Sequence, residues 1–326
     1  MLDVTYGTDA SLYLAFESSI GALPGTPKPK NIAFVSESIK GARSLGQNQA
    51  LSGDPNPLDS IPLRMTAEGP LVLQPGPLTS ALMWRWILSN MTPDVSVPSA
   101  STFESILTRG KALSATVDVV LNETNELVKR VHGAIVDQCT IAVGPDGFLQ
   151  HQLTIAALKT TKETVVMTGD PVVDLTTDEP YHHGQIAESD IIIDGAVANL
   201  SSLSITLNMN ADKTIYVIGG GGYRQGLGRQ RAAITGQIRA YLTDDTLWTM
   251  LKASEYHDVS CRWAVDATHF LTIQLPRTLL QETDPDVAGP GALMLDFQLE
   301  ASKDEASETA IIVTTGNAED GTAYAT

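Results

Sequence analysis

The sequence predicts a mainly β protein made of two tandem β-sandwich or half-barrel domains, each with one short helix and a long extended loop. Apolar and polar residues alternate with a period of two over many segments, as expected for strands that bury one face. Helical spacing of apolar residues is confined to a few short segments. The same order of parts occurs in both halves of the chain, which indicates an internal repeat.

Length and charge limit the classes of function. The 326 residues correspond to about two domains. With 21 basic and 38 acidic residues the net charge is −17, too acidic for a general nucleic-acid binder. No apolar run approaches the ~20 residues that span a bilayer, and the first residues carry no basic segment, so we expect neither a membrane partner nor a signal peptide. Cys139 and Cys261 do not make a disulfide framework and are expected in the core.

The first half predicts a complete set of elements. Val117, Val119 and Leu121 illustrate its period-two strands. A helix is expected with Thr79 or Ser80 as its cap and with Leu82, Trp84 and Trp86 in the core. The expected elements are, in order, a strand at 33–39, a polar loop at 41–60, a strand at 61–67, a helix at 80–88, a further strand and a hairpin around Gly144.

The second half repeats that order. Asp244 or Asp245 is expected to cap its helix, with Leu247, Trp248 and Leu251 buried, so that Trp248 takes the place of Trp84. The expected elements are a strand at 200–208 continuing in 213–218, a Gly-rich loop at 219–232, a strand at 233–241, a helix at 245–253, and strands with a hairpin over 263–299. A further, weaker helical pattern lies at 102–109.

The repeat predicts domain boundaries. We expect a first domain at 1–165 with an intertwined N-terminal strand, a linker at 166–190, a second domain at 191–316 and a flexible C-terminus at 317–326.

Two long loops at matching places are the candidate functional segments, because long loops inside compact domains are uncommon and usually functional. Three arginines gather in the second loop of a chain with net charge −17, which predicts an arm that docks on the acidic surface of an identical neighbour. The alternative is three solvated arginines. The candidate residues are Leu45, Gln47, Asn48, Asp54, Asn56 and Asp59 in the first loop and Gly219, Gly222, Tyr223, Arg224, Gln225, Arg229 and Arg231 in the second.

No motif selects a catalytic, cofactor or metal site, and the chain is not expected to be an enzyme. The glycines at 219–228 match neither common phosphate-binding pattern. Asp284 begins a sequence that lacks the ligands of a calcium loop, and His182 and His183 have no partners at metal-ligand spacing. A hydrolytic carboxylate pair stays open, since acidic residues are abundant and nothing selects one pair.

Several segments together resemble a known family. They are a short strand at 12–21 followed by Pro24 and Pro27, a strand at 36–39 running through Arg43 to 53–54, a strand at 234–242 with Gly236, and a late strand at 270–277 ending in Pro-Arg. Their order over about residues 10–315 resembles the tail tube proteins of long-tailed bacteriophages, in the form with a duplicated domain.

The resemblance implies a structural virion protein. Its members form rings that stack into a hollow tube for DNA, and a duplicated chain implies a trimeric ring with pseudo-sixfold symmetry. It also implies as partners a tape-measure protein and DNA in the lumen, without sequence-specific binding, and the tail terminator and distal tail proteins. It implies synthesis in the host bacterial cytoplasm and no cofactor.

Charge suits a conduit, because a negative lumen would repel DNA phosphates, although the outer surface could carry the charge instead. Three alternatives are a soluble two-domain β-sandwich module that binds carbohydrate or protein, a hydrolase on a β scaffold, and another tail component such as a terminator or hub.

Overall fold

The computed structural model describes residues 7–48, 56, 59–93, 102–107, 110–122, 127–169, 173–186, 191–243, 245–285 and 291–317, and it is mainly β. Its first part contains a 3-10 turn (η1, Gly7–Asp9), β1 (Ser11–Phe16), β2 (Lys30–Ile32), β3 (Ser36–Glu37), β4 (Lys40–Gln47), β5 (Ser60–Leu73), α1 (Pro77–Leu88), β6 (Thr92–Pro93), β7 (Thr102–Ile106), β8 (Ala115–Asn122), β9 (Leu127–Val143), β10 (Gln150–Ala157) and β11 (Lys159–Glu163).

The rest of the chain adds a second series of strands and one helix. It contains β12 (Val173–Asp174), η2 (His183–Gln185), β13 (Ile191–Ile193), β14 (Ala196–Val197), β15 (Leu200–Asn208), β16 (Ala211–Asp212), β17 (Gly228–Arg229), β18 (Ala233–Tyr241), α2 (Thr246–Ala253), β19 (Tyr256–Ala264), β20 (Phe270–Leu280), β21 (Met294–Ala301) and β22 (Ile312–Gly316).

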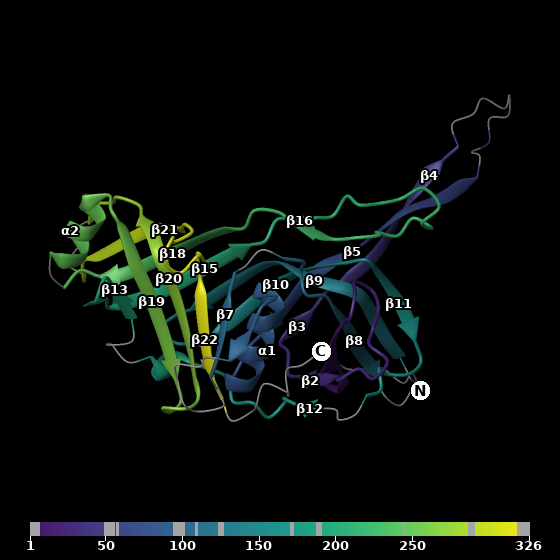
Figure 1. Cartoon of the computed structure of the whole chain (residues 1–326), viewed down its shortest axis with the longest axis horizontal. Helices are drawn as coiled ribbons and strands as arrows, with labels where there is room; N and C mark the ends of the chain where they lie inside the picture. The colour runs from purple at the N-terminus through teal and green to yellow at the C-terminus, as the bar shows by residue number, and fades with distance from the viewer. Residues whose placement is uncertain are drawn as a thin grey trace.

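One antiparallel sheet runs through the length of the molecule (Figure 1). Its strands follow the order β4–β5–β10–β9–β15–β18–β21. Along each strand, buried and less buried residues alternate, as in β15, where Leu203, Ile205 and Leu207 are buried. One face of this sheet therefore belongs to the core, as the period-two pattern predicts.

Strand β9 belongs to two sheets. Its carboxy-terminal half lies between β10 and β15, and its amino-terminal half lies between β8 and β11. Gly133 lies between the two halves with φ +62, and a Cβ there would meet the side chain of Leu158 at 2.6 Å. The buried Glu17 carboxylate accepts the Gly133 N–H at 2.9 Å and the Thr116 hydroxyl at 2.7 Å. A glycine and a buried acid thus fix the change of sheet.

The strand pairing of the first part recurs in the second part. We call these two groups the first set and the second set of strands. In the first set, β1 pairs with β8 and β8 with β9, while β3 and β4 pair with β5 and β5 pairs with β10. In the second set, β13–β19–β20 and β15–β18–β21 pair in the same order. β9 joins β10 as β20 joins β21. Each helix follows the corresponding strand, α1 after β5 and α2 after β18.

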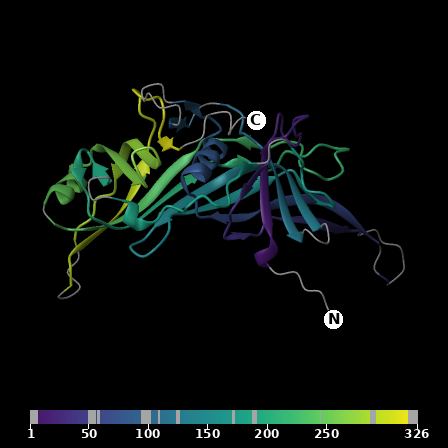
Figure 2. The same ribbon diagram turned by 90° about the horizontal axis from the view of Figure 1, so that it is seen from below.

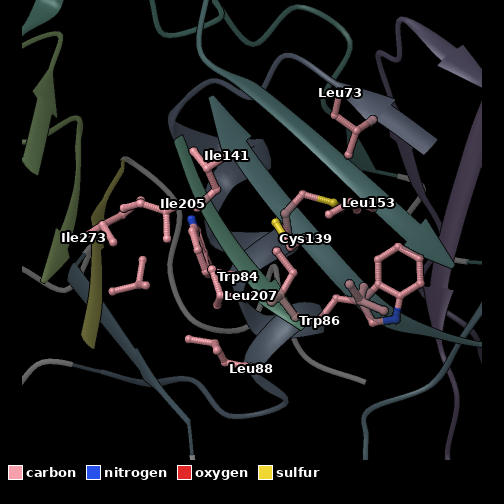
Figure 3. Packing of buried hydrophobic residues seen from close by; sticks show 14 of the residues in the cluster. Leu73, Trp84, Trp86, Leu88, Cys139, Ile141, Leu153, Ile205, Leu207 and Ile273 are labelled. Carbon is pink, nitrogen blue, oxygen red and sulfur yellow. The ribbon is translucent and has the colours of Figure 1, made fainter. Parts of the chain in front are cut away.

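Helix α1 packs on one face of the long sheet (Figure 2). Leu82, Trp84 and Trp86 are fully buried, and the indole N–H of Trp86 donates to the Ala134 carbonyl at 3.2 Å. Trp84 and Trp86 lie among side chains of both sets, including Cys139 of β9 and Ile205 and Leu207 of β15 (Figure 3). Cys139 and Cys261 are buried free thiols, as predicted.

Three predicted elements are wrong. Residues 102–106 form strand β7, not a helix, because they pair with β22. This partner lies far away in the sequence, so the local pattern did not indicate it. Residues 41–47 of the loop predicted at 41–60 form β4, which pairs with β5 as a hairpin whose exposed strands give no one-sided apolar pattern; residues 49–55, 57 and 58 lie outside the described residues. The segment 213–218 does not continue the strand before it, since the chain leaves the sheet after Asn208 and forms an arm.

The predicted ends of the helices also need correction. Helix α1 begins at Pro77, and the carboxylate of Asp178, not Thr79 or Ser80, accepts the N–H groups of Leu78 at 3.3 Å and Thr79 at 2.7 Å. Burial raises the pKa of Asp178, although these N–H bonds act in the opposite direction. Asp245 precedes α2 but makes no capping hydrogen bond.

Residues of the predicted linker, and the residues just before the predicted C-terminus, contact the first set of strands. Within 166–190, β12 pairs with β2 in parallel, and Leu175 and Tyr181 are buried. β22 pairs with β7, and the fully buried Asn317 donates its amide to the Pro77 carbonyl at 3.4 Å. Residues 318–326 lie outside the described residues, and the flexible C-terminus stays a prediction. The division into two domains stays a prediction, because these contacts interleave the two sets.

Candidate assembly site on two projecting arms

Two extended segments leave the sheet side by side (Figure 1). We call residues 40–47 and 60–66 the hairpin arm and residues 209–232 the second arm. The Met65 N–H donates to the Gly222 carbonyl at 2.8 Å, and the Tyr216 hydroxyl donates to the Met65 carbonyl at 3.0 Å. The segments predicted as two separate loops are therefore bound to each other.

Cations and aromatic rings reinforce this contact. The guanidinium of Arg43 lies 5.0 Å from the ring centre of Tyr223, and that of Arg64 lies 5.1 Å from the ring centre of Tyr216. Each pair joins one arm to the other, and such pairs contribute roughly 0.5–1 kcal/mol at exposed sites. The hairpin arm and the second arm thus form one projection.

Arg224 anchors the second arm at its base. Its side chain is buried, and its Nη1 donates to the carbonyls of Ala67 and Ala157, both at 3.2 Å. Its Nη2 lies 3.4 Å from the carboxylate of Glu68. Its Nε donates to the Lys213 carbonyl at 3.1 Å. Four acceptors of the same chain therefore hold this guanidinium, whereas the sequence predicted an arginine available to a neighbour.

Arg229 is also bound within the chain. Its Nη2 donates to the carbonyls of Ile87 and Trp86, at the carboxy-terminal end of α1, where a cation is favourable. Burial lowers its pKa to about 10. Arg231 is exposed. Arg224 and Arg229 therefore connect the second arm to the first set and are not solvated, while docking of this arm on a neighbour stays a prediction.

A chain of ion pairs holds the base of the second arm. Lys213 Nζ lies 2.6 Å from the Asp137 carboxylate and 3.8 Å from that of Glu68. Asp137 also accepts the Ala211 N–H at 2.7 Å. Next to them, Asp212 accepts the hydroxyl and N–H of Thr214, which lowers the Asp212 pKa. The base of the arm is fixed by polar contacts.

Toward their ends, both arms expose aliphatic side chains that sequence reasoning missed as a group. The Leu45 side chain is 70% exposed, and Ile218 is fully exposed. Exposed apolar surface of this kind marks sites of interaction. The exposed aliphatic residues of the arms are Leu45, Ile61, Leu63, Ile215, Val217 and Ile218. The sequence predicted that the strand at 200–208 continues in 213–218, so the exposure of this segment was not foreseen.

The other predicted loop residues lie on or beside the arms. Leu45 and Gln47 are on β4, while Asn48, Asn56 and Asp59 are exposed near the end of the hairpin arm. Asp54 lies outside the described residues. Gly219 and Gln225 are exposed, and Gly222 and Tyr223 contact the hairpin arm.

The predicted helix residues divide by helix. Leu82, Trp84 and Trp86 are buried in α1, and Leu251 is buried in α2. Leu247 packs partly buried against the core, but Trp248 is 37% exposed. The prediction that Trp248 is buried is wrong for the single chain.

Other kinds of site find no support in the part of the chain that is described. No group of three or more His, Cys, Asp or Glu residues there is placed to hold a metal ion. None of its helices has the length and apolar character to cross a membrane.

The family model described as phage tail tube protein matches residues 7–301. No curated protein matches the chain.

Proposed function

Because this chain belongs to the phage tail tube protein family, we propose that it assembles into stacked rings that form the tube through which DNA leaves the virion. In this proposal three copies close a ring, since each copy supplies two sets of strands. The tape-measure protein and DNA occupy the bore, terminator and distal tail proteins cover the ends, and synthesis takes place in the host cytoplasm.

The seam between the two sets carries the proposal. Residues 138–143 of β9 pair with residues 208–203 of β15, so the first set passes into the second without a break in the sheet. In a single chain, each end of this continuous sheet has no further set of strands beside it. Repeating the same seam between copies removes both ends and closes a barrel.

The repeat identifies the strand that would serve at the start of the chain. Glu37 pairs with Leu71 and Gly41 with Ala67, as Leu203 pairs with Ile238 and Leu207 with Ile234. Residues 37–42 therefore correspond to 203–208. Among the described strands, β4 pairs with β5 alone, so the edge that corresponds to the seam has no strand beside it.

The same comparison identifies the segment at the other end. β20 corresponds to β9, and beyond it the Gln281 N–H donates to the Gln298 carbonyl at 2.8 Å. Residues 281–285 thus correspond to the part of β9 that starts at Gln138. A seam between copies would place Lys40 opposite Thr283, as Thr206 lies opposite Thr140.

Side chains protect the free edge in the single chain. The Ser38 N–H donates to the Pro70 carbonyl, so the backbone of Ile39 faces away from β5. The Ile39 N–H is bound by the Glu37 carboxylate, and its carbonyl accepts Lys129 Nζ at 3.0 Å. A joining strand would take over these two bonds. Such protection of an edge limits uncontrolled pairing.

Cysteine cross-linking tests the seam. In Lys40→Cys/Thr283→Cys, the first position lies on β4 and the second follows the segment that bonds to β21. These are the two ends of the strand order of the long sheet, so we expect a disulfide only between copies. Opposed positions whose backbones do not bond to each other bring Cβ atoms close enough for a disulfide. We expect covalent trimers after oxidation of assembled protein. Thr140→Cys/Thr206→Cys is the control within one chain, since the two hydroxyls lie 3.1 Å apart.

Monomers alone in the oxidised double variant, with the control bridge formed and tubes visible by electron microscopy, would refute this seam. Particles that stay monomeric under all conditions, including with tail initiator proteins, would refute ring assembly and favour the binding-module alternative.

Stacking of rings is assigned to the arms. The exposed aliphatic residues at their ends suit apolar docking on the next ring, and the inward arginines do not suit a salt-sensitive contact. We expect Ile218→Asp to leave the subunit folded and to give short stacks or single rings in electron micrographs, with Ile218→Val as the conservative control. Normal tubes from Ile218→Asp would show that the second arm is not the stacking contact.

A further inference from the structure

The seam within the chain is apolar on the side of the sheet where α1 packs (Figure 3). Cys139 of β9 lies opposite Leu207 of β15, and Ile141 lies opposite Ile205, so apolar side chains meet directly across the seam. Leu203 and, near the end of α1, Ile87 belong to the same buried cluster.

Charged residues occupy the corresponding positions where the proposed ring joins two copies. The strand positions follow from the register that relates 281–285 to β9 and 37–42 to 203–208. The helix position follows from the ends of α1 and α2, which are Ser89 and Ser254, both in the left-handed conformation. The corresponding residues, with that of the inner seam first, are Cys139 and Glu282, Ile141 and Asp284, Leu203 and Glu37, and Ile87 and Lys252.

In the single chain these charges are already paired. Lys252 Nζ lies 2.7 Å from the Glu282 carboxylate and 2.8 Å from that of Asp284, and the hydrogen bond from Lys252 lowers the pKa of Asp284. The three side chains are open to water, with 39%, 55% and 69% of their surface exposed. Glu37 is paired with Lys129 Nζ at 2.5 Å. Exposed pairs such as those of Lys252 add little to the stability of the free subunit.

A seam between copies brings the two groups of charges together. It places Asp284 of one copy opposite Ile39 of the next, as Ile141 lies opposite Ile205. Lys129 Nζ lies 3.0 Å from the Ile39 carbonyl, so this ammonium is beside the place that Asp284 takes. Covered by the joining strand as Ile141 is covered by β15, the carboxylates lose the water that now surrounds them.

We propose that two copies join over an ionic cluster at the place where the seam within the chain is apolar. Its members are Lys252, Glu282 and Asp284 of one copy and Glu37 and Lys129 of the next. The inference rests on the proposed ring. Taking ion pairs out of water costs free energy, so the joint between copies is weaker than an apolar one. Charges that point inward at the end of a sheet also keep free subunits from pairing out of register.

Removal of the cation tests the cluster, because a carboxylate buried without its partner is strongly unfavourable. In the Lys40→Cys/Thr283→Cys chain, we expect Lys252→Met to require roughly tenfold more protein to give covalent trimers. Adding Glu282→Gln/Asp284→Asn to that chain should restore the trimers at the original concentration. Lys303→Met, at an exposed lysine after β21, is the matched control. Circular dichroism should show all these subunits folded alike.

The outcomes separate this inference from the proposed ring. Equal trimer formation by Lys252→Met and its parent would refute the cluster and leave the seam standing. A loss of trimers that the two amide substitutions do not restore would also refute it, since the carboxylates would then not be the cause. Absence of trimers from the parent would refute the seam itself, and this inference with it.

An apolar copy of the inner seam tests the claim that the charges weaken the joint. In the same cysteine background, Lys252→Ile/Glu282→Val/Asp284→Ile should give covalent trimers at a several-fold lower protein concentration than the parent. The disulfide distinguishes joining in this register from unspecific aggregation. A need for more protein than the parent would show that the ion pairs strengthen the joint, and would overturn the claim.

Discussion

Helices α1 and α2 occupy corresponding places in the two sets, yet their surroundings differ. Of the 12 residues of α1, ten are buried, and Asp178 and Arg229 bind its two ends. Of the eight residues of α2, Leu251 is the buried one. α1 lies at the seam between the sets, where strands of the second set, β20 and β22, pack on it. α2 lies at one end of the molecule (Figure 1), which is where the proposed ring places the next copy.

The difference teaches that burial of a helix in this chain depends on the strands beside it as well as on its own sequence. Two helices with similar apolar content differ because one has a neighbouring set in its own chain. A second copy would give α2 the cover that α1 already has.

The largest expected effect is the difference between truncating Trp84 of α1 and truncating Trp248 of α2. Trp84→Ala should lower the free energy of unfolding by about 3–5 kcal/mol, because it empties a fully buried site. Trp248→Ala should lower that of the isolated subunit by less than about 1 kcal/mol, since the side chain is partly exposed, and should weaken tube assembly instead. Urea denaturation and electron microscopy measure the two effects. Equal destabilisation of the subunit by both variants would contradict the comparison.

Acid should lower the free energy of unfolding through a histidine that packs against α1. His151 packs edge-on against Trp84 with 5.6 Å between ring centres, and burial lowers its pKa to about 3, below the ordinary 6.5. The unfolded chain then binds a proton that the folded chain excludes, so stability is lost as the pH falls from 6.5 toward 3, by up to about 1.4 kcal/mol per pH unit.

The variant His151→Phe should remove this part of the acid sensitivity, measured as the free energy of unfolding at several pH values. Leu295 takes the corresponding place in β21, so the second set has no equivalent group. An unchanged pH dependence in the variant would show that His151 does not contribute.

Arginine truncation tests the arms. Arg224→Ala removes hydrogen bonds from a cation to two buried carbonyls and should cost about 2 kcal/mol. Arg231→Ala, at an exposed position of the same arm, should stay within about 0.5 kcal/mol. Thermal or urea unfolding compares them, and the reverse order would mean that the second arm is not anchored through Arg224.

The smallest expected effect concerns the helix caps. Asp178→Ala leaves the first N–H groups of α1 without their acceptor and should cost about 1 kcal/mol. Asp245→Ala should have almost no effect, because Asp245 makes no capping bond to α2. A similar loss of stability in both variants would argue that α2 is capped in solution.

Sequence reasoning identified most strands and both helices, because one-sided burial leaves a periodic trace. It failed where both sides of a segment are exposed, as in β4, and where a partner lies far along the chain, as for β7 with β22. The candidate site was found in part. The two loops were located, but their mutual contact, the inward Arg224 and Arg229 and the exposed aliphatic residues were not.

By itself, the sequence determined the β class, the repeat of parts, the buried faces of the strands and the family resemblance, since each depends on local patterns or their order. Tertiary structure alone decided that Asp178 caps α1, that the arms bind each other and that β9 continues into β15. These contacts join residues far apart in the chain, so no local pattern encodes them, and their free energy exists only once both partners have been brought together.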